Sequence, residues 1–154
     1  MRIALHNPEI PQNTGGILRL CACFGVPLEI IEPCGFQMTD AKLKRAGMDY
    51  IAKAHMTVHP DWESFRAACP GRLLLATTKA SESIYDFAFD AEDILVFGSE
   101  SSGAPEHVHA AADCRIRIPM RPNIRSFNLA VSAGIILSEA LRQTGGLPSP
   151  GGDV

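Results

Sequence analysis

The sequence predicts an α/β fold in which a mostly parallel sheet carries helices on both faces. Short apolar runs of strand length recur along the chain, and helical patterns lie between them. Strands that alternate with helices in this way form parallel sheets that are covered on both sides. Glycine, amide and arginine residues gather at the ends of three of these runs. Because α/β proteins bind ligands where their strands stop, these segments are the candidates for a functional site.

Six apolar runs predict the strands of this sheet. They are Ile3–Leu5, Leu28–Ile31, Met56–Val58, Leu73–Ala76, Ile94–Phe97 and Ile116–Ile118. Between the first two, Thr14 can cap a helix that runs to Phe24, and Gly25 can end it in the left-handed conformation.

The remaining helices are also marked by residues typical of helix ends. We expect a short basic helix from Thr39 or Asp40 to Gly47, a helix over Trp62–Ala68 opened by Asp61, a helix from Pro105 through Ala112, and a last helix from about Asn128 to Gln143 that stops at Gly145-Gly146.

The last helix is apolar on more than one face. Leu129, Ala133, Ile136, Leu137, Ala140 and Leu141 form one face, while Val131 and Ile135 form a second, and no charge appears before Glu139. A helix that is apolar all round must be buried on all sides. We therefore expect a homodimer through this helix; a central core helix in a monomer is the alternative.

The chain of 154 residues has the length of one domain, which we place at 1–144, followed by a flexible tail at 145–154 rich in glycine and proline. No apolar run approaches the roughly 18 residues of a membrane helix. The N-terminus lacks the architecture of a signal peptide. We expect a cytoplasmic protein that does not associate with membranes.

Cysteine and histidine usage gives no sign of a metal centre. The five cysteines are odd in number and without CxxC spacing, and the five histidines have no cysteine or carboxylate at ligand spacing. Cys21 and Cys23 lie in an apolar helical pattern. Because unpaired cysteine behaves as a small hydrophobe, we expect buried free thiols and no bound metal.

The net charge of −3 argues against a uniformly basic nucleic-acid-binding surface, but the charges are unevenly distributed. From Glu82 to Asp113 there are eight acids and no lysine or arginine, whereas Cys114–Arg125 holds four arginines and no acid. Lys42, Lys44 and Arg45 form a second basic group. A local basic patch can hold phosphates on an acidic protein; an ordinary solvated face is the other interpretation.

The first candidate segment, 7–19, joins the first strand to the first helix. Its prolines and glycine pair fix the loop, Asn13 lies at its end, and Arg19 lies about one and a half helical turns further into the helix. An arginine among apolar neighbours is costly to bury unless it is paired. Arg19 therefore either forms a salt bridge, to Glu100 or an aspartate, or faces a functional site.

The second and third segments lie close together near the C-terminus. Gly98-Ser-Glu-Ser-Ser-Gly103 follows a strand and precedes a helix, but it lacks the second glycine of the dinucleotide fingerprint and is not a nucleophile elbow. In 117–128, two prolines stiffen the approach to the last helix. Ser126 or Asn128 can cap that helix while offering polar groups to a ligand.

Together these segments resemble the SPOUT class of RNA methyltransferases, and within it the short TrmL-type (YibK-like) enzymes. The resemblance runs from the first strand to Gln143. The matching residues are Asn13, Gly15, Arg19, the segments 31–36 and 45–50, Gly98, Glu100, Gly103, 118–120, Ser126, Asn128 and Leu129.

The resemblance implies a C-terminal deep trefoil knot, an obligate homodimer, and methylation of the ribose 2′-hydroxyl at the wobble nucleotide, position 34, of the tRNA anticodon stem-loop. S-adenosylmethionine would be the methyl donor, without a metal. Its site would comprise Ala76, Gly98, Ile118, Met120 and Ser126.

Catalysis would fall to Arg19, Glu100 and Asn128. A 2′-hydroxyl is a poor nucleophile, so the enzyme must align it with the methyl group and stabilise charge developing on its oxygen. By resemblance Arg19 has this role; since arginine keeps its proton, electrostatic stabilisation is favoured over general-base catalysis. Glu100 would orient Arg19 or Asn13, and Arg125 would contact a phosphate of the RNA.

Three alternatives remain at this point. The enzyme could methylate another tRNA position or ribosomal RNA. The chain could be a non-catalytic RNA-binding or nucleotide-binding module, although the joint presence of Arg19, Glu100, Ser126 and Asn128 argues against this. It could also be a flavodoxin-like domain with an unrelated ligand, which the lack of phosphate-loop chemistry disfavours.

Overall fold

A computed structural model describes residues 1–38, 41, 45 and 50–149 of the chain. The elements in order are β1 (Arg2–His6), α1 (Pro11–Phe24), β2 (Leu28–Ile31), α3 (Ile51–Ala54), β3 (Met56–His59), α4 (Trp62–Ala68), β4 (Leu73–Ala76), β5 (Glu82–Ser83), β6 (Ile94–Phe97), α5 (Glu106–Ala111), β7 (Cys114–Arg117) and α6 (Leu129–Thr144).

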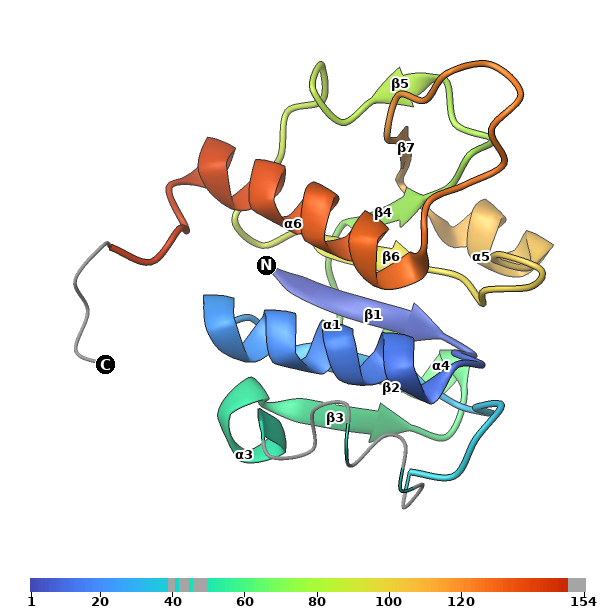
Figure 1. Cartoon of the computed structure of the whole chain (residues 1–154), viewed down its shortest axis with the longest axis vertical. Coiled ribbons are helices and arrows are strands. Elements are labelled where there is room, and N and C mark those ends of the chain that lie inside the picture. The colour runs from blue at the N-terminus through green and yellow to red at the C-terminus, as the bar shows by residue number, and fades with distance from the viewer. Residues whose placement is uncertain (39–40, 42–44, 46–49, 150–154) are drawn as a thin grey trace.

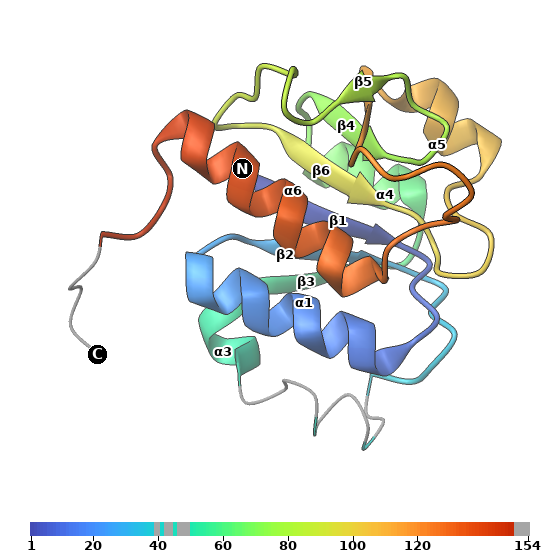
Figure 2. The same cartoon turned by 45° about the horizontal axis from the view of Figure 1, so that its top comes forward.

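The strands form one sheet in the order β3-β2-β1-β6-β4-β7-β5, and every pairing in it is parallel. Helices α1 and α6 cover one face, and α4 and α5 cover the other (Figures 1 and 2). The predicted α/β class is confirmed. Because all strands run the same way, the carboxyl ends of β6, β4 and β7 meet at one edge of the sheet, where a ligand site is expected.

Two apolar cores lie on either side of the sheet, as its period-two alternation requires. On the α1 and α6 side, Ile3, Leu5, Leu28 and Ile30 pack against Ile17 and its neighbours. On the α4 side, alternate residues of the same strands pack around Phe65. The central strands β1, β2, β4 and β6 are therefore buried on both faces, which explains why they form continuous apolar runs in the sequence.

The predicted start of the first helix was wrong. Helix α1 begins at Pro11, which suits a first helical position because its missing N–H needs no partner there. The N-cap is Ile10, which supplies no side-chain cap, and Thr14 lies one turn inside the helix. Gly25 ends the helix in the left-handed conformation, as predicted.

Thr14 is fully buried, and its Oγ1 is the one buried side-chain polar atom without a hydrogen-bond partner among the described residues. Replacing Thr14 with valine removes the unsatisfied hydroxyl and keeps the shape. We expect the free energy of unfolding to rise by about 1 kcal/mol. Urea denaturation of the two proteins measures this, with Thr57→Val on exposed β3 as control. A less stable Thr14→Val protein would mean that the hydroxyl is bonded.

The other predicted elements are confirmed with small shifts of their ends. Asp61 caps α4 by accepting a hydrogen bond from Ser64 N. The last strand begins two residues earlier than predicted, and Pro105 is the N-cap of α5 rather than its first residue. The two-residue β5 and the single-turn α3 were missed. The predicted helix over 40–47 lies largely outside the described residues.

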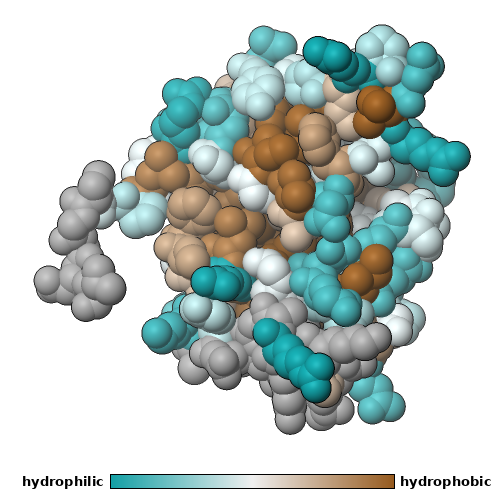
Figure 3. Space-filling view, in the orientation of Figure 1, coloured by the Kyte–Doolittle hydropathy of each residue, from teal (hydrophilic) through white to brown (hydrophobic). Residues whose placement is uncertain are grey.

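Helix α6 is buried along the first of its two predicted faces, from Ala133 to Leu141. Val131, from the second face, is 48% exposed. In the view of Figure 3, apolar residues form a broad area across the middle of the face that α1 and α6 present. A broad exposed apolar area of this kind marks an interaction site on a soluble protein.

In the described part of the chain, no helix has the length and apolarity needed to cross a membrane.

The cysteines are all free, as expected, but they are not all buried. Cys21 and Cys69 are buried, Cys34 and Cys114 are half-buried, and Cys23 is exposed near the end of α1. The expectation that Cys23 packs in the core was therefore wrong.

Candidate active site

A cavity of about 540 Å³ lies at the carboxyl ends of β4, β6 and β7. The residues that follow these strands line it, together with the N-terminal parts of α1 and α6. Of the nine predicted site residues, eight line the cavity: Ala76, Gly98, Glu100, Ile118, Met120, Arg125, Ser126 and Asn128. Segments that lie far apart in the sequence are thus brought to one site.

The loop after β6 forms one wall of the cavity. Ser99 and Gly103 form an antiparallel bridge, with N···O distances of 3.2 and 2.9 Å. Gly103 has a φ of +71°, which favours glycine. At Gly98 the backbone packs so closely that a Cβ would lie 2.2 Å from both Ala104 N and Gly103 C. The glycines of this segment therefore serve to close the loop tightly.

Glu100 fastens this loop to the start of α1. Its carboxylate accepts hydrogen bonds from Glu9 N at 2.8 Å, Ile10 N at 3.1 Å and Asn13 Nδ2 at 3.2 Å. The negative charge lies at the N-terminal end of α1, where a helix dipole favours it. Of the two predicted partners of Glu100, Asn13 is therefore the one that the structure supports.

Asn13 and Asn128 extend this connection to α6. Asn128 Nδ2 donates to Asn13 Oδ1 at 2.9 Å. Asn128 Oδ1 in turn accepts from Ala130 N and Val131 N, which makes Asn128, and not Ser126, the cap of the last helix. A continuous chain of hydrogen bonds thus links the loop after β6 to the first turns of both α1 and α6.

A second pair of hydrogen bonds joins the same loop to the segment before α1. The carboxylate of Glu9 accepts from Ser101 N at 2.8 Å and from Ser101 Oγ at 2.7 Å. These hydrogen bonds lower the pKa of the Glu9 carboxyl. Glu9 and Glu100 therefore bind each other's loops reciprocally, and the wall of the cavity is set before any ligand arrives.

Several lining residues were not predicted. Thr77, Thr78 and Lys79 directly follow β4, so the rule that ligands bind at strand ends, which marked Gly98, could have found them.

The cavity has a cationic character. Lys79, Arg117 and Arg125 line it, whereas its one acidic lining residue, Glu100, is held by amide groups. Such a lining suits a ligand with a carboxylate or a phosphate.

Arg19 lies outside this cavity. It is exposed on α1, and its guanidinium carbon lies 5.4 Å from the centre of the Tyr50 ring. The predicted salt bridge to Glu100 is not formed, because that carboxylate binds the start of α1. Within one subunit, Arg19 therefore faces neither Glu100 nor the cavity.

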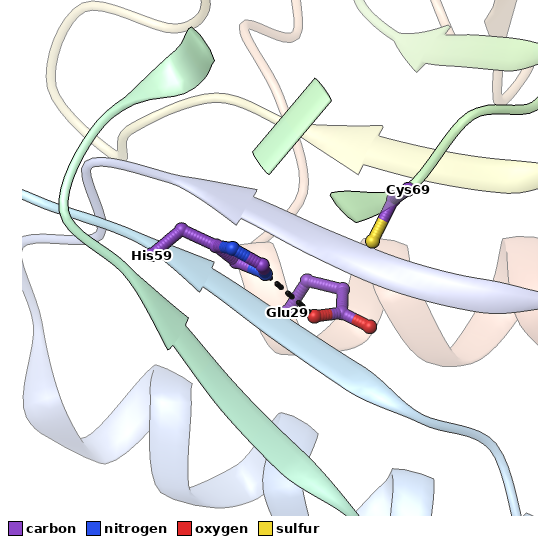
Figure 4. Close-up of side chains that lie close together, drawn as sticks. All are labelled: Glu29, His59 and Cys69. Carbon is purple, nitrogen blue, oxygen red and sulfur yellow. Dashed lines mark hydrogen bonds and ion pairs between the residues drawn. The ribbon is translucent and has the colours of Figure 1, made fainter. Parts of the chain in front are cut away.

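A separate polar cluster lies beneath α4. Figure 4 shows His59 and Glu29 pointing toward each other from β3 and β2, with the Cys69 sulfur nearby. His59 Nε2 lies 2.8 Å from Glu29 Oε2, and the ligand atoms of the three residues lie within 4.8 Å of one another. Arg2 donates to Glu29 Oε1 at 2.8 Å and to Cys69 Sγ at 3.3 Å.

The Glu29 carboxylate of this cluster is paired at both oxygens, with Arg2 at Oε1 and with His59 at Oε2. Arg2 also donates to Cys69 Sγ, and burial raises the pKa of the Cys69 thiol. We therefore favour a buried polar network over a metal site at this position. We expect dialysis against a chelator to leave the melting temperature unchanged. A lower melting temperature, restored by added zinc, would show that a metal is bound here.

The chain is similar to known RNA methyltransferases over nearly all its length. The model of the SpoU rRNA Methylase family matches residues 1–138. A tRNA (cytidine(34)-2'-O)-methyltransferase of Beijerinckia indica is 51% identical over 148 residues, which cover 94% of this chain and 92% of that protein.

Two solved structures share the fold. One, described as giving structural insights into the 2-OH methylation of C/U34 on tRNA, has a TM-score of 0.88 and 40% identity over 92% of this chain and 94% of its own. The other, AviRb of Streptomyces viridochromogenes in complex with AdoMet, has a TM-score of 0.82 and 26% identity over 93% of this chain and 60% of its own. The chain therefore belongs to the SpoU rRNA methylase family.

Proposed function

We propose that this protein transfers the methyl group of S-adenosylmethionine to the ribose 2′-hydroxyl of nucleotide 34 in tRNA, through one catalytic domain that spans 1–144. One observation carries the proposal: eight of the nine residues expected from the family resemblance line a single cavity. The 51% identity to a relative with this named activity supports the choice of substrate.

The cavity fits S-adenosylmethionine in size and in lining. Small-molecule sites typically measure about 300–1,000 Å³, and this cavity has about 540 Å³. Ile118 and Met120 offer apolar contact to an adenine ring, whereas Ser126 offers a hydroxyl. Lys79 and Arg117 are the cations available to a carboxylate. Gly98 lets the loop after β6 pack against its own backbone, which forms one wall of this cavity.

The bound donor supplies a methyl group that its sulfonium already activates. The residues of the chain then have to align the ribose hydroxyl and stabilise charge on its oxygen. Asn128, fixed by Asn13 and by the first turn of α6, lies in the cavity with its orientation set. Glu100 holds the loop to α1, and Arg125 is the phosphate contact. Arg19 stabilises the developing alkoxide while keeping its own proton, and the hydroxyl proton passes to solvent water as the oxygen–carbon bond forms and the carbon–sulfur bond breaks.

A homodimer would bring Arg19 to a cavity. Arg19 is exposed on α1, and α1 lies on the same side of the sheet as α6 (Figure 1). Val131, Phe127 and Ile10 are each more than 40% exposed at the ends of these helices. We propose that two copies pack through this face, bury those side chains and bring Arg19 beside the partner's cavity.

We also propose that the C-terminal part of the chain forms a deep trefoil knot. Two features of the topology support it. Strand β7 enters the sheet between β4 and β5, which precede it in the chain. The chain then crosses back from β7 to α6, which packs beside α1.

The experiment that tests the function is transfer of radiolabelled methyl from S-adenosylmethionine to unmodified bulk tRNA, followed by nucleoside mapping. We expect label on the ribose of nucleotide 34, lost in Arg19→Ala and kept in Arg66→Ala on the opposite face of the sheet. Cofactor binding without label on tRNA would reject the wobble assignment and favour ribosomal RNA. No cofactor binding would reject the enzyme altogether.

A mixed dimer tests the origin of Arg19. One subunit carries Arg19→Ala and the other carries Gly98→Ala, which damages its own cavity. If Arg19 acts across the interface, the intact cavity receives the intact arginine, and the mixed dimer has about half the activity of the native dimer. If Arg19 acts within its own subunit, the mixed dimer is inactive.

A further inference from the structure

Tyr50 belongs to the segment 45–50 that carries part of the family resemblance, yet it does not line the cavity. Its ring lies against one residue of the proposed mechanism, since the Arg19 guanidinium carbon is 5.4 Å from the ring centre. We infer that Tyr50 is a positioning residue, whose ring holds Arg19 in place for attack at the 2′-hydroxyl. This inference rests on the proposed role of Arg19.

The backbone places Tyr50 next to the helix that carries Arg19. Tyr50 is the N-cap of α3, and α3 packs against α1, which carries Arg19. Tyr50 is half-buried, whereas Arg19 is exposed. The exposed guanidinium therefore lies over a half-buried ring, and the packing of α3 on α1 brings the two side chains together.

An aromatic partner suits an arginine that must act on a substrate. The ring face attracts the guanidinium within about 6 Å. A carboxylate would also hold the side chain, but it would neutralise the charge and occupy the N–H donors. The ring restrains the guanidinium and leaves its edge donors available for an alkoxide or a phosphate. Pre-ordering also reduces the entropy lost when the substrate binds.

The test compares Tyr50→Leu with Tyr50→Phe, which keeps the ring. In the methyl-transfer assay with tRNA, we expect kcat to fall roughly tenfold in Tyr50→Leu and to stay near the native value in Tyr50→Phe. The affinity for S-adenosylmethionine should be unchanged in both, because Tyr50 lies outside the cavity. Tyr85→Leu, at a tyrosine that is 59% exposed, is the matched control and should keep full activity.

A double mutant separates positioning of Arg19 from a general structural role. In an Arg19→Ala background, assayed at high enzyme concentration for residual methyl transfer, Tyr50→Leu should cause no further loss of rate, because the group it positions is gone. An additive loss would overturn the inference. So would a Tyr50→Phe protein as impaired as Tyr50→Leu, since that result would assign the effect to the hydroxyl.

A measurement independent of activity tells failure of this inference from failure of the proposed function. In the NMR spectrum, the Arg19 Nε–H signal should carry a ring-current shift that Tyr50→Phe keeps and Tyr50→Leu removes, with the melting temperature showing that each variant is folded. A signal that does not respond to Tyr50→Leu would overturn the positioning. A native protein that shows this shift but does not methylate tRNA would overturn the proposed function and leave the contact standing.

Discussion

A Gly98→Ala protein is expected to lose its binding of S-adenosylmethionine. The added Cβ would lie 2.2 Å from Ala104 N and from Gly103 C, where real Cβ contacts do not fall below 3.0 Å. Both opposing atoms belong to backbone, so no side-chain rotation relieves the clash. The loop after β6 must move outward, and Glu100 moves with it.

The size of the effect follows from the required movement. Overpacking of a rigid site costs about 1–3 kcal/mol of folding stability. Since about 1.4 kcal/mol corresponds to tenfold in affinity, about 3 kcal/mol of strain at the binding wall corresponds to about a hundredfold weaker binding. We expect the melting temperature to fall, and isothermal titration to show cofactor affinity reduced by at least about a hundredfold.

The matched control is Gly16→Ala in α1. A Cβ there meets only Ala130 Cβ, at 3.5 Å, which is an ordinary contact. Alanine is also the better helix former by about 1 kcal/mol. Gly16→Ala should therefore bind cofactor normally and melt no lower than the native protein. Normal cofactor binding by Gly98→Ala would mean that the loop is not the wall we describe.

Much of the cavity could be predicted because its residues occupy positions that local chemistry marks. Gly98 and Ile118 follow apolar strands, and the carboxyl ends of parallel strands meet at one edge of a sheet. The cap of α6 could be narrowed to Ser126 or Asn128 from the chemistry of helix starts. Because the central strands are buried on both faces, they form continuous apolar runs, and these runs predicted the strands.

The start of α1 could not be read in this way, because its stabilising partner comes from another part of the chain. Thr14 looked like a cap by residue type, but the helix begins at Pro11, and the carboxylate of Glu100 holds the residues around its start by accepting from Ile10 N and Asn13 Nδ2. Local rules weigh only neighbours in sequence, and a tertiary contact can override them. The contact between Arg19 and Tyr50 also joins residues far apart in the sequence, so local rules could not predict it.

The exposed residues of α6 and the exposed Cys23 show a second limit of prediction from sequence. The pattern of α6 correctly indicated two apolar faces, but sequence cannot distinguish cover by the same chain from cover by a second copy. The chain itself covers Ile136 and Leu137 and leaves Val131 half exposed. The apolar pattern around Cys23 likewise could not show whether this chain covers the residue, and in the structure Cys23 is exposed near the end of α1.

A Glu100→Gln protein is expected to fold and to be nearly inactive. The native carboxylate accepts three hydrogen bonds, from two backbone amides and from Asn13. Glutamine keeps the shape but offers only one acceptor oxygen, and its NH₂ group would face a donor. Each lost bond to a charged acceptor costs about 1.5–3 kcal/mol. The melting temperature should fall while the protein remains native.

Catalysis should suffer more than cofactor binding, because Glu100 acts through its neighbours. Release of Asn13 frees Asn128, and a misplacement of about 1 Å at a reacting centre costs about a hundredfold in rate. We expect kcat for methyl transfer to fall about a hundredfold with a smaller change in cofactor affinity. Glu92→Gln, at an exposed carboxylate, should show neither effect. If Glu100→Gln lost stability but kept its kcat, the hydrogen-bonded chain from the loop to α6 would serve folding alone, and the alignment of Asn128 would need another source.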